Sequence, residues 1–308
     1  MLRTFFVRLS ENPSLRSFAE RSSLGRRVSG RFVAGTEIAD AVRATQAINR
    51  AGMSVSIDNL GENVTNPDEA RHSAELYHQI LDAIVANQLN ANISLKLTHM
   101  GLDVDEKLAR DIVSGLVAKA ASMDPPGFVR VDMEGSPYTK RTLDFVHELH
   151  RMPGNANSVG TVIQSYLKRS ESDVEKLMAE RIRIRLCKGA YKESADIAFA
   201  DKADVDANYV KLMKILMKSG VYHGLATHDE SIIRQAQAFA TSEKLSRDSF
   251  EFQMLYGIRR DLQRRLAREG WRLRVYIPFG SEWYPYFMRR LGERPANVLF
   301  IARNLLRS

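Results

Sequence analysis

The period with which apolar positions recur changes repeatedly along this chain. Eight short runs of β-branched or apolar residues are separated by longer segments with the period of amphipathic helices. The runs occupy residues 53–58, 92–97, 128–133, 158–164, 181–186, 222–227, 250–255 and 273–278. Eight strands alternating with helices predict an α/β fold, a closed parallel (β/α)8 barrel of the TIM type. An open doubly wound sheet usually has fewer strands, and the glycine fingerprint of dinucleotide-binding sheets is missing from the sequence.

The segments between the runs carry signals for helix starts and ends. Asn66, Pro67, Asp68 and Glu69 supply a cap, a proline and an acidic first turn for a helix that continues to about residue 88. Residues 170–181 and 206–220 have the same helical period, and Gly220 predicts the end of the second helix. The segments between the runs are therefore predicted to be helices.

The first 35 residues differ from the rest in composition, because they are rich in Arg and Ser and poor in acidic residues. We predict a basic helical arm over residues 1–35 and one catalytic barrel over residues 36–308. An organelle transit peptide has a similar composition and is the alternative for the arm.

Charge narrows the choice of partners. The net charge is +8 and the pI is about 9.6, with basic residues concentrated in the arm and in residues 258–274. Such a balance suits a membrane surface or a nucleic acid. Aromatic residues are not interleaved with the basic ones as in a single-strand binder, so a membrane surface is favoured and no nucleic acid is expected. A solvated basic face is the alternative.

Cysteine content, histidine spacing and hydropathy argue against a disulfide-bonded protein, a metalloprotein and a membrane-spanning protein. Cys187 is the single cysteine, which excludes an intramolecular disulfide and a multi-cysteine metal site. His228 and Asp229 are adjacent, but no second histidine stands at ligand spacing on the same element, so no metal is expected. No run of apolar residues is long enough to span a membrane.

Candidate chemistry lies where the predicted strands end, because barrel enzymes place their active sites at the C-terminal ends of the strands. Nearly every predicted strand ends with a charged or hydrogen-bonding side chain. These residues are Asp58, Lys96, Asp132, Gln164, Arg185, Thr227 with His228, and Tyr276. Any one of them could be a solvent-exposed strand end, but the set converges on one mouth and predicts a site there.

Lys96 lies between leucines on the second run and is expected to point into the barrel. A buried ammonium needs an acidic partner or a ligand carboxylate, and Asp132 is the expected partner. A lysine that forms a Schiff base, as in barrel aldolases, is the alternative.

Two further motifs are suited to anionic ligands. Arg185-Leu-Cys-Lys-Gly-Ala-Tyr191 places two cations three residues apart, and its Gly-Ala pair permits close approach to a backbone. Near the C-terminus, Tyr286, Arg289, Arg290 and Glu293 are spaced for one side of a helix, and two guanidinium groups are well suited to holding a carboxylate.

Together these motifs resemble the proline dehydrogenase family, from about residue 35 to the C-terminus. The most specific pieces are Arg185-x-x-Lys-Gly-Ala-Tyr191, Ala226-Thr-His-Asp229, Phe250-Glu-Phe-Gln253 and Tyr286-x-x-Arg-Arg-x-x-Glu293. The length is similar to that of monofunctional bacterial members. The sequence departs from bifunctional members at Lys192, where a tryptophan is common, and from some relatives at Asp229, where asparagine stands.

The resemblance implies a distorted barrel with extra N-terminal helices, which holds FAD noncovalently over the strand ends. The residues it assigns to proline are Lys96, Asp132, Tyr276, Tyr286, Arg289, Arg290 and Glu293, with Glu62 closing the site by pairing with Arg289. The residues it assigns to the flavin are Met133, Gln164, Arg185, Lys188, Gly189, Ala190, Tyr191, Thr227, His228 and Glu251.

The implied reaction is hydride transfer from L-proline to flavin N5, giving 1-pyrroline-5-carboxylate, followed by electron transfer to a membrane quinone. The family therefore implies a cytoplasmic protein, peripheral on the inner face of the cell membrane, with a separate 1-pyrroline-5-carboxylate dehydrogenase as a candidate partner. No general base is evident, and Lys96 is expected to favour the neutral amine by repelling its proton. The rival interpretations are another FAD barrel such as a folate reductase, a Schiff-base aldolase, and a non-catalytic nucleic-acid-binding protein.

Overall fold

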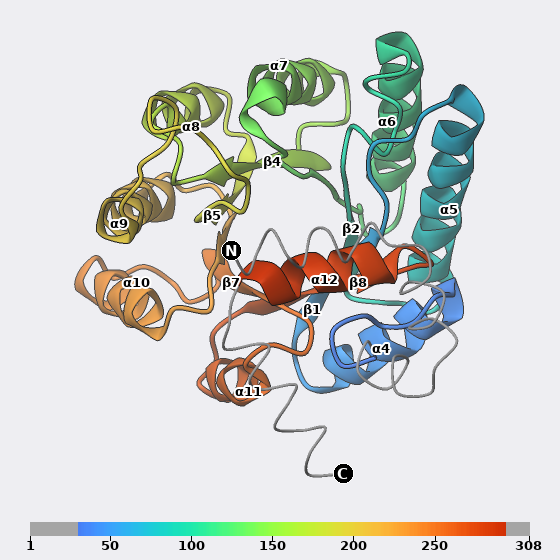
Figure 1. Cartoon of the computed structure of the whole chain (residues 1–308). Coiled ribbons are helices and arrows are strands. Elements are labelled where there is room, and N and C mark those ends of the chain that lie inside the picture. The colour runs from blue at the N-terminus through green and yellow to red at the C-terminus, as the bar shows by residue number, and fades with distance from the viewer. Residues whose placement is uncertain (1–29, 294–308) are drawn as a thin grey trace.

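The computed structural model describes residues 30–293, and the side chains of residues 30–288 among them (Figure 1). Within this range eight parallel strands pair in chain order and close into a barrel. The strands are β1 Ser54–Asn59, β2 Ala91–Leu95, β3 Val129–Val131, β4 Val159–Gln164, β5 Arg183–Cys187, β6 His223–Ala226, β7 Phe250–Leu255 and β8 Leu273–Phe279. Each of the eight runs expected from the sequence forms one of these strands, so the predicted barrel is confirmed.

Helices alternate with the strands, and all the described ones except the last form the outer layer of the barrel. Their bounds are α4 Ile38–Arg50, α5 Pro67–Ala86, α6 Glu106–Ala121, α7 Ser136–Arg151, α8 Ser170–Ala179, α9 Lys202–Lys218, α10 Glu230–Ser242, α11 Arg260–Arg268 and α12 Trp283–Glu293. The expected start of α5 is confirmed, because the side chain of Asn66 accepts hydrogen bonds from the backbone N–H groups of Asp68 and Glu69. Gly220 follows α9 with a φ of 69°, which suits glycine.

The apolar core lies between the strands and the surrounding helices. Side chains such as Ile57, Leu95 and Val131 are at most 1% exposed and belong to this core. Side chains alternate across a strand, so the neighbouring positions face the inside of the barrel. Several of those are polar, including the buried Ser56 and Ser94, whereas barrel interiors are usually filled by branched apolar residues. The polar interior leads directly to the mouth.

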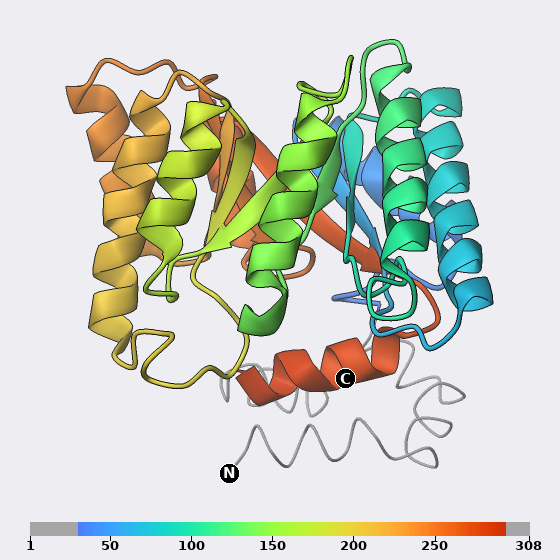
Figure 2. The ribbon, with the colours of Figure 1, turned by 90° about the horizontal axis from the view of Figure 1, so that it is seen from above.

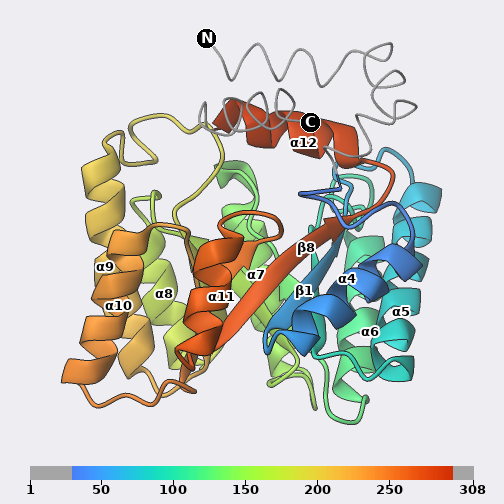
Figure 3. The ribbon, with the colours of Figure 1, turned by 90° about the horizontal axis from the view of Figure 1, so that it is seen from below.

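The last helix gives the barrel its distorted form. Figures 2 and 3 show α12 lying across the end of the barrel at which the strands finish, instead of alongside β8. The outer position beside β8 and β1 is taken by α4, which contacts both strands (Figure 3). Because α4 covers the outside of the barrel at β8 and β1, α12 can lie across the open end of the barrel, which we call the mouth.

Residues 30–35 join the mouth of the barrel to α12. Ala34 N–H donates to the carbonyl oxygen of Pro278 at 2.9 Å, and Gly280 N–H donates to that of Gly35 at 2.9 Å. Phe32 and Val33 belong to a separate apolar cluster, which also contains residues of α12. These last residues of the predicted arm therefore pack on the barrel. Residues 1–29 lie outside the described part, and the boundary at residue 35 stays a prediction.

The tight packing of the barrel wall gives a stability prediction for Gly160 in β4. A Cβ at this position would lie 2.3 Å from the carbonyl oxygen of Arg183 and 2.8 Å from Cζ of Phe128. Gly160→Ala should therefore lower the free energy of unfolding by about 1–3 kcal/mol in urea denaturation. Gly115→Ala in α6 is the control, since a Cβ there meets nothing within 4 Å. It should raise that free energy by roughly 0.5–1 kcal/mol. Equal effects of the two substitutions would contradict this picture.

Candidate active site

A cavity of about 1160 Å³ opens at the mouth of the barrel, and residues of α12 such as Tyr286 and Phe287 contribute to its lining. This exceeds the roughly 300–1,000 Å³ of ordinary small-molecule pockets. The structure brings together most of the residues expected to form the site. Those that line the cavity are Glu62, Lys96, Asp132, Met133, Gln164, Arg185, Lys188, Gly189, Ala190, Tyr191, Thr227, His228, Tyr276 and Tyr286. Side chains from well-separated parts of the chain therefore share one space.

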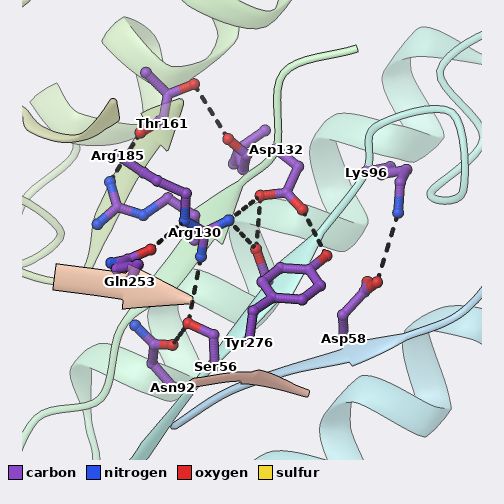
Figure 4. Close-up of polar contacts among 12 residues, drawn as sticks. Ser56, Asp58, Asn92, Lys96, Arg130, Asp132, Thr161, Arg185, Gln253 and Tyr276 are labelled. Carbon is purple, nitrogen blue, oxygen red and sulfur yellow. Dashed lines mark hydrogen bonds and ion pairs between the residues drawn. The ribbon is translucent and has the colours of Figure 1, made fainter. Parts of the chain in front are cut away.

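Arg185 lies at the centre of the polar interior, 6% exposed (Figure 4). Its guanidinium donates to Asp132 Oδ1 at 2.7 Å and to Gln253 Oε1 at 2.5 Å. It also donates to the hydroxyl oxygens of Ser94 at 3.2 Å and Ser56 at 3.3 Å. The ring of Tyr276 lies 5.1 Å from the guanidinium carbon. One side chain from β5 thus contacts residues from five other strands or their ends.

Asp132 completes this arrangement at the end of β3. Its second carboxylate oxygen accepts a hydrogen bond from the Tyr276 hydroxyl at 2.9 Å, and Oδ1 accepts one from Ser94 at 2.7 Å (Figure 4). Burial, followed by the nearby carboxylates of Asp132 and Asp58, raises the pKa of Tyr276 well above its ordinary value. Tyr276 therefore presents a neutral phenol and an apolar ring to the cavity.

The acid in ion-pair contact with Lys96 is not the one expected from the sequence. Lys96 Nζ lies 3.6 Å from Asp58 Oδ2, whereas Asp132 is taken up by Arg185 and Tyr276 (Figure 4). Burial disfavours the ammonium, but the carboxylates of Asp58 and Asp132 outweigh it and raise the pKa of Lys96 above its ordinary value. Lys96 is therefore a fixed cation at the cavity wall, which disfavours the Schiff-base alternative.

The motif that ends β5 is held by both charge and shape. Lys188 Nζ lies 2.5 Å from Asp206 Oδ1 and 2.9 Å from Asp229 Oδ2. Gly189 has a φ of 117°, and a Cβ there would lie 2.2 Å from the ring of Tyr166. A side chain at residue 189 is therefore excluded by both backbone conformation and space.

The polar residues at the ends of β4 and β6 form hydrogen bonds with the backbone. Gln164 donates from Nε2 to the carbonyl oxygen of Glu134 at 2.9 Å. His228 Nε2 accepts a hydrogen bond from the backbone N–H of Leu255 at 3.0 Å, so this nitrogen carries no proton. Thr227 Oγ1 accepts from the N–H of Asp229 at 3.0 Å.

Four expected site residues do not appear among the side chains described at the mouth. Arg289, Arg290 and Glu293 lie in α12, but their side chains fall outside the described part. Glu251 lies near the start of β7, towards the opposite end of the barrel, and does not line the cavity. Its carboxylate pairs with Arg274 Nε at 2.6 Å and accepts from the Tyr222 hydroxyl at 2.9 Å. The expected cofactor contact of Glu251 is therefore corrected to a structural ion pair.

Two further residues line the cavity. Asp58 was predicted to lie at the mouth but was given no role there, although β1 and β2 pair in parallel with Asp58 opposite Ser94, two residues before Lys96. His99 follows β2 and is 6% exposed, and a Cβ on Gly61 would lie 2.2 Å from its Nε2. Burial and the charge of Lys96 lower the pKa of His99 to about 3. No sequence signal singled out His99.

Each of three described cations at the mouth is paired with one or two acidic side chains. Lys96 faces Asp58, Arg185 faces Asp132, and Lys188 faces Asp206 and Asp229. Within residues 30–293, no group of three His, Cys, Asp or Glu side chains is placed to hold a metal ion.

Comparison with known proteins places this geometry in a family. A family profile described as "Proline dehydrogenase" matches residues 41–303, most of the chain. The chain belongs to the proline dehydrogenase family. Membership makes it an oxidoreductase of the proline dehydrogenase type and confirms the resemblance found in the motifs.

Several members of the proline dehydrogenase family match over the whole chain. Proline dehydrogenase 1 of Bacillus subtilis is 41% identical, covering 100% of both chains. Proline dehydrogenase of Deinococcus radiodurans is 39% identical over 100% of this chain and 98% of its own. The bifunctional protein PutA of Escherichia coli is 26% identical over 88% of this chain but only 24% of its own length. The likeness to monofunctional members is thus the stronger one.

Solved structures support the fold. The proline utilization A protein of Bdellovibrio bacteriovorus, inactivated by N-propargylglycine, superposes with a TM-score of 0.80 at 24% identity. The match covers 87% of this chain and 32% of that protein. A second proline utilization A structure, with proline bound in remote sites, gives a TM-score of 0.75. This chain spans about a third of each of these proteins.

The buried, neutral His99 gives a prediction for stability in acid. Its folded-state pKa of about 3 lies below the unfolded value of about 6.5, so the unfolded chain binds the extra proton between these values. Stability contributed by the neutral ring is present above about pH 6.5 and is lost as pH falls towards 3. Urea titrations at several pH values would measure this. Between about pH 6.5 and 3, the free energy of unfolding should fall less steeply in His99→Gln than in the unaltered protein, by up to about 1.4 kcal/mol per pH unit. Exposed His72→Gln is the control, and parallel curves for His99→Gln and the unaltered protein would contradict the assignment.

Proposed function

We propose that this protein oxidises L-proline to 1-pyrroline-5-carboxylate with noncovalently bound FAD, and that its electrons pass to a membrane quinone. The observation that carries the proposal is the cavity of about 1160 Å³ at the strand ends, lined by most of the residues that the family resemblance assigns to flavin and proline. Membership of the proline dehydrogenase family supports the reaction.

The residues present fit a dinucleotide. Arg185 and Lys188 supply cations on one wall, Gln164 and Thr227 supply polar groups, and Gly189 contributes backbone without a side chain to the lining. In this proposal Met133, Ala190, Tyr191 and His228 complete the flavin-binding wall. When bound there, FAD supplies the hydride acceptor.

The proline side of the cavity would be formed by Lys96, Tyr276 and Tyr286, with Arg289 and Arg290 holding the carboxylate and Glu293 orienting them. The Tyr276 hydroxyl is already committed to Asp132, so its ring is the surface offered to the pyrrolidine. Glu62, which lines the cavity from the loop after β1, would close the site. In this proposal, these side chains contribute to the reaction mainly by orienting the proline ring carbon next to nitrogen towards the flavin.

Membrane attachment is proposed on the inner face of the cell membrane, by basic surface rather than by insertion. Within residues 30–293 no helix is long and apolar enough to cross a bilayer. Arg264 and Arg268 lie exposed on α11, next to Arg265, which pairs with Glu230. Exposed arginines attract anionic lipid. The match to a bifunctional relative supports a further proposal, that a separate dehydrogenase consumes the product.

The spectrum of the purified protein tests the cofactor and the substrate together. A flavin absorbance should bleach when L-proline is added without air, and D-proline should leave it unchanged. A flavin spectrum indifferent to L-proline would refute the substrate and keep the cofactor. No flavin absorbance after addition of FAD would refute the cofactor.

Lys96→Met tests the proposed role of the fixed cation. Loss of the positive charge should make the protonated amine easier to bind, so the rise in the limiting rate of flavin bleaching should move to higher pH. Stopped-flow measurements at saturating L-proline across pH would show the shift. Exposed Lys107→Met is the control, and an unchanged profile for Lys96→Met would refute the role.

Vesicle sedimentation tests membrane attachment. The protein should bind vesicles with anionic lipid, release them as salt rises, and ignore neutral vesicles. Arg264→Gln with Arg268→Gln should weaken binding while dye-linked proline oxidation stays unchanged. Binding that does not change with salt, or no binding to anionic vesicles, would contradict the proposed membrane attachment.

The proposed electron acceptor needs a separate measurement. A short-chain quinone should accept electrons from the reduced enzyme, and failure to do so would contradict the quinone as acceptor.

A further inference from the structure

The segment between β5 and α9 carries four residues of the proposed flavin site, the first of which is Lys188, and is mostly exposed. Gly189, Ala190 and Tyr191 line the cavity, and Tyr191 is 37% exposed, a high value for a large side chain. Figures 2 and 3 show this connection extending at the mouth towards one end of α12. An exposed connection of this length needs specific contacts to hold one conformation.

Glu193 provides such a contact, because its half-buried carboxylate reaches a helix from another part of the mouth. Its Oε1 accepts a hydrogen bond from the backbone N–H of Ser136 at 2.7 Å, and its Oε2 accepts one from the Ser136 hydroxyl at 2.5 Å. Ser136 is the first residue of α7, and the preceding Gly135 has no side chain to cap the helix. Glu193 therefore supplies the cap that α7 lacks, at the positive end of its dipole.

Tyr166 fastens the same segment from the end of β4. Its N–H donates to the carbonyl oxygen of Lys188 at 2.9 Å, and its own carbonyl oxygen accepts from Phe199 N–H at 2.8 Å. Its ring occupies the space beside Gly189, and its hydroxyl lies 3.4 Å from Glu193 Oε1 as a donor. Residues 188–199 are thus held at both ends by Tyr166 and in the middle by Glu193.

We propose that Glu193, bonded to Ser136 and Tyr166, is a positioning residue that holds residues 189–191 in the conformation that binds the flavin. We call these contacts the Glu193 bridge. The bridge ties together the connections that follow β3, β4 and β5, although no residue of it is assigned to the flavin itself. The inference rests on the proposed FAD site.

Flavin affinity is the first measurement. Glu193→Ala removes both acceptors and should raise the FAD dissociation constant about tenfold, as expected for loss of charge-assisted hydrogen bonds. Glu193→Gln keeps one oxygen to accept from Ser136 N–H and should recover part of the affinity. Asp196→Ala is the matched control, because Asp196 is an exposed acid of the same segment, bonded to Ser194 within it. It should bind FAD as the unaltered protein does.

Hydrogen exchange separates the bridge from the cofactor. In protein stripped of flavin, the amides of residues 188–199 should exchange faster in Glu193→Ala than in the unaltered chain, with no such change in Asp196→Ala. Ser136→Ala, which removes one donor and nothing else from the bridge, should give a smaller change in the same direction. It keeps the test decisive if Glu193→Ala fails to fold.

The outcomes are distinct. If the unaltered protein binds no FAD, the proposed function fails, while the exchange rates still decide whether the bridge holds the segment. If the unaltered protein binds FAD and the Glu193 and Ser136 variants bind it equally well, the inference is overturned, even if exchange is faster. Equal exchange rates in all variants would overturn it as well.

Discussion

The buried guanidinium of Arg185 is the interaction on which the candidate site depends. It comes from β5 and crosses the interior to contact side chains of β1, β2, β7 and β8 and the residue after β3. An arginine this deeply buried is tolerable only with its donors satisfied, so Ser56, Ser94, Asp132 and Gln253 are constrained along with it. The polar interior is therefore a requirement of the site and not a defect of the core. It also fixes Asp132, which in turn fixes the ring of Tyr276 at the cavity wall.

The mouth is built by contacts between connections that are far apart in the chain. Residues 30–35 bond to the end of β8, Glu193 caps α7, and Lys188 is held between Asp206 and Asp229. Each contact ties a connection at the mouth to another part of the barrel. Loops usually vary more than the elements they connect. Here the connections contact one another or the neighbouring helices, so a substitution in one connection is expected to change the conformation of the elements that it contacts.

The fold could be predicted from the sequence because its signals are local. Eight runs with strand composition and the cap at Asn66 each depend on a few adjacent residues, and the structure has the strands and the helix start where they were expected. The set of strand-end residues followed from the barrel itself, since all strands point the same way. The partner of Lys96 did not follow, because β2 lies between β1 and β3 and the sequence offers an acid on each side. Glu251 was assigned by motif, and its place near the start of β7 directs it to the other end of the barrel. The roles of His99 and Glu193 depend on contacts between segments far apart in the chain, and such contacts produce no periodic pattern in the sequence.

The placement of α4 has a consequence for how this architecture can diversify. The barrel closes through its eight strands, and α4 shields the seam where β8 meets β1. The helix α12 is therefore not needed to cover the outside of the sheet, and it lies across the mouth of the barrel instead. It follows β8 after a short turn and packs in an apolar cluster that includes Phe32 and Leu60. A helix in that position can change its sequence, tilt or length with little effect on closure of the ring. The side chains of α12 that line the cavity, such as Tyr286, can then change while the strand-end residues of the same cavity stay as they are.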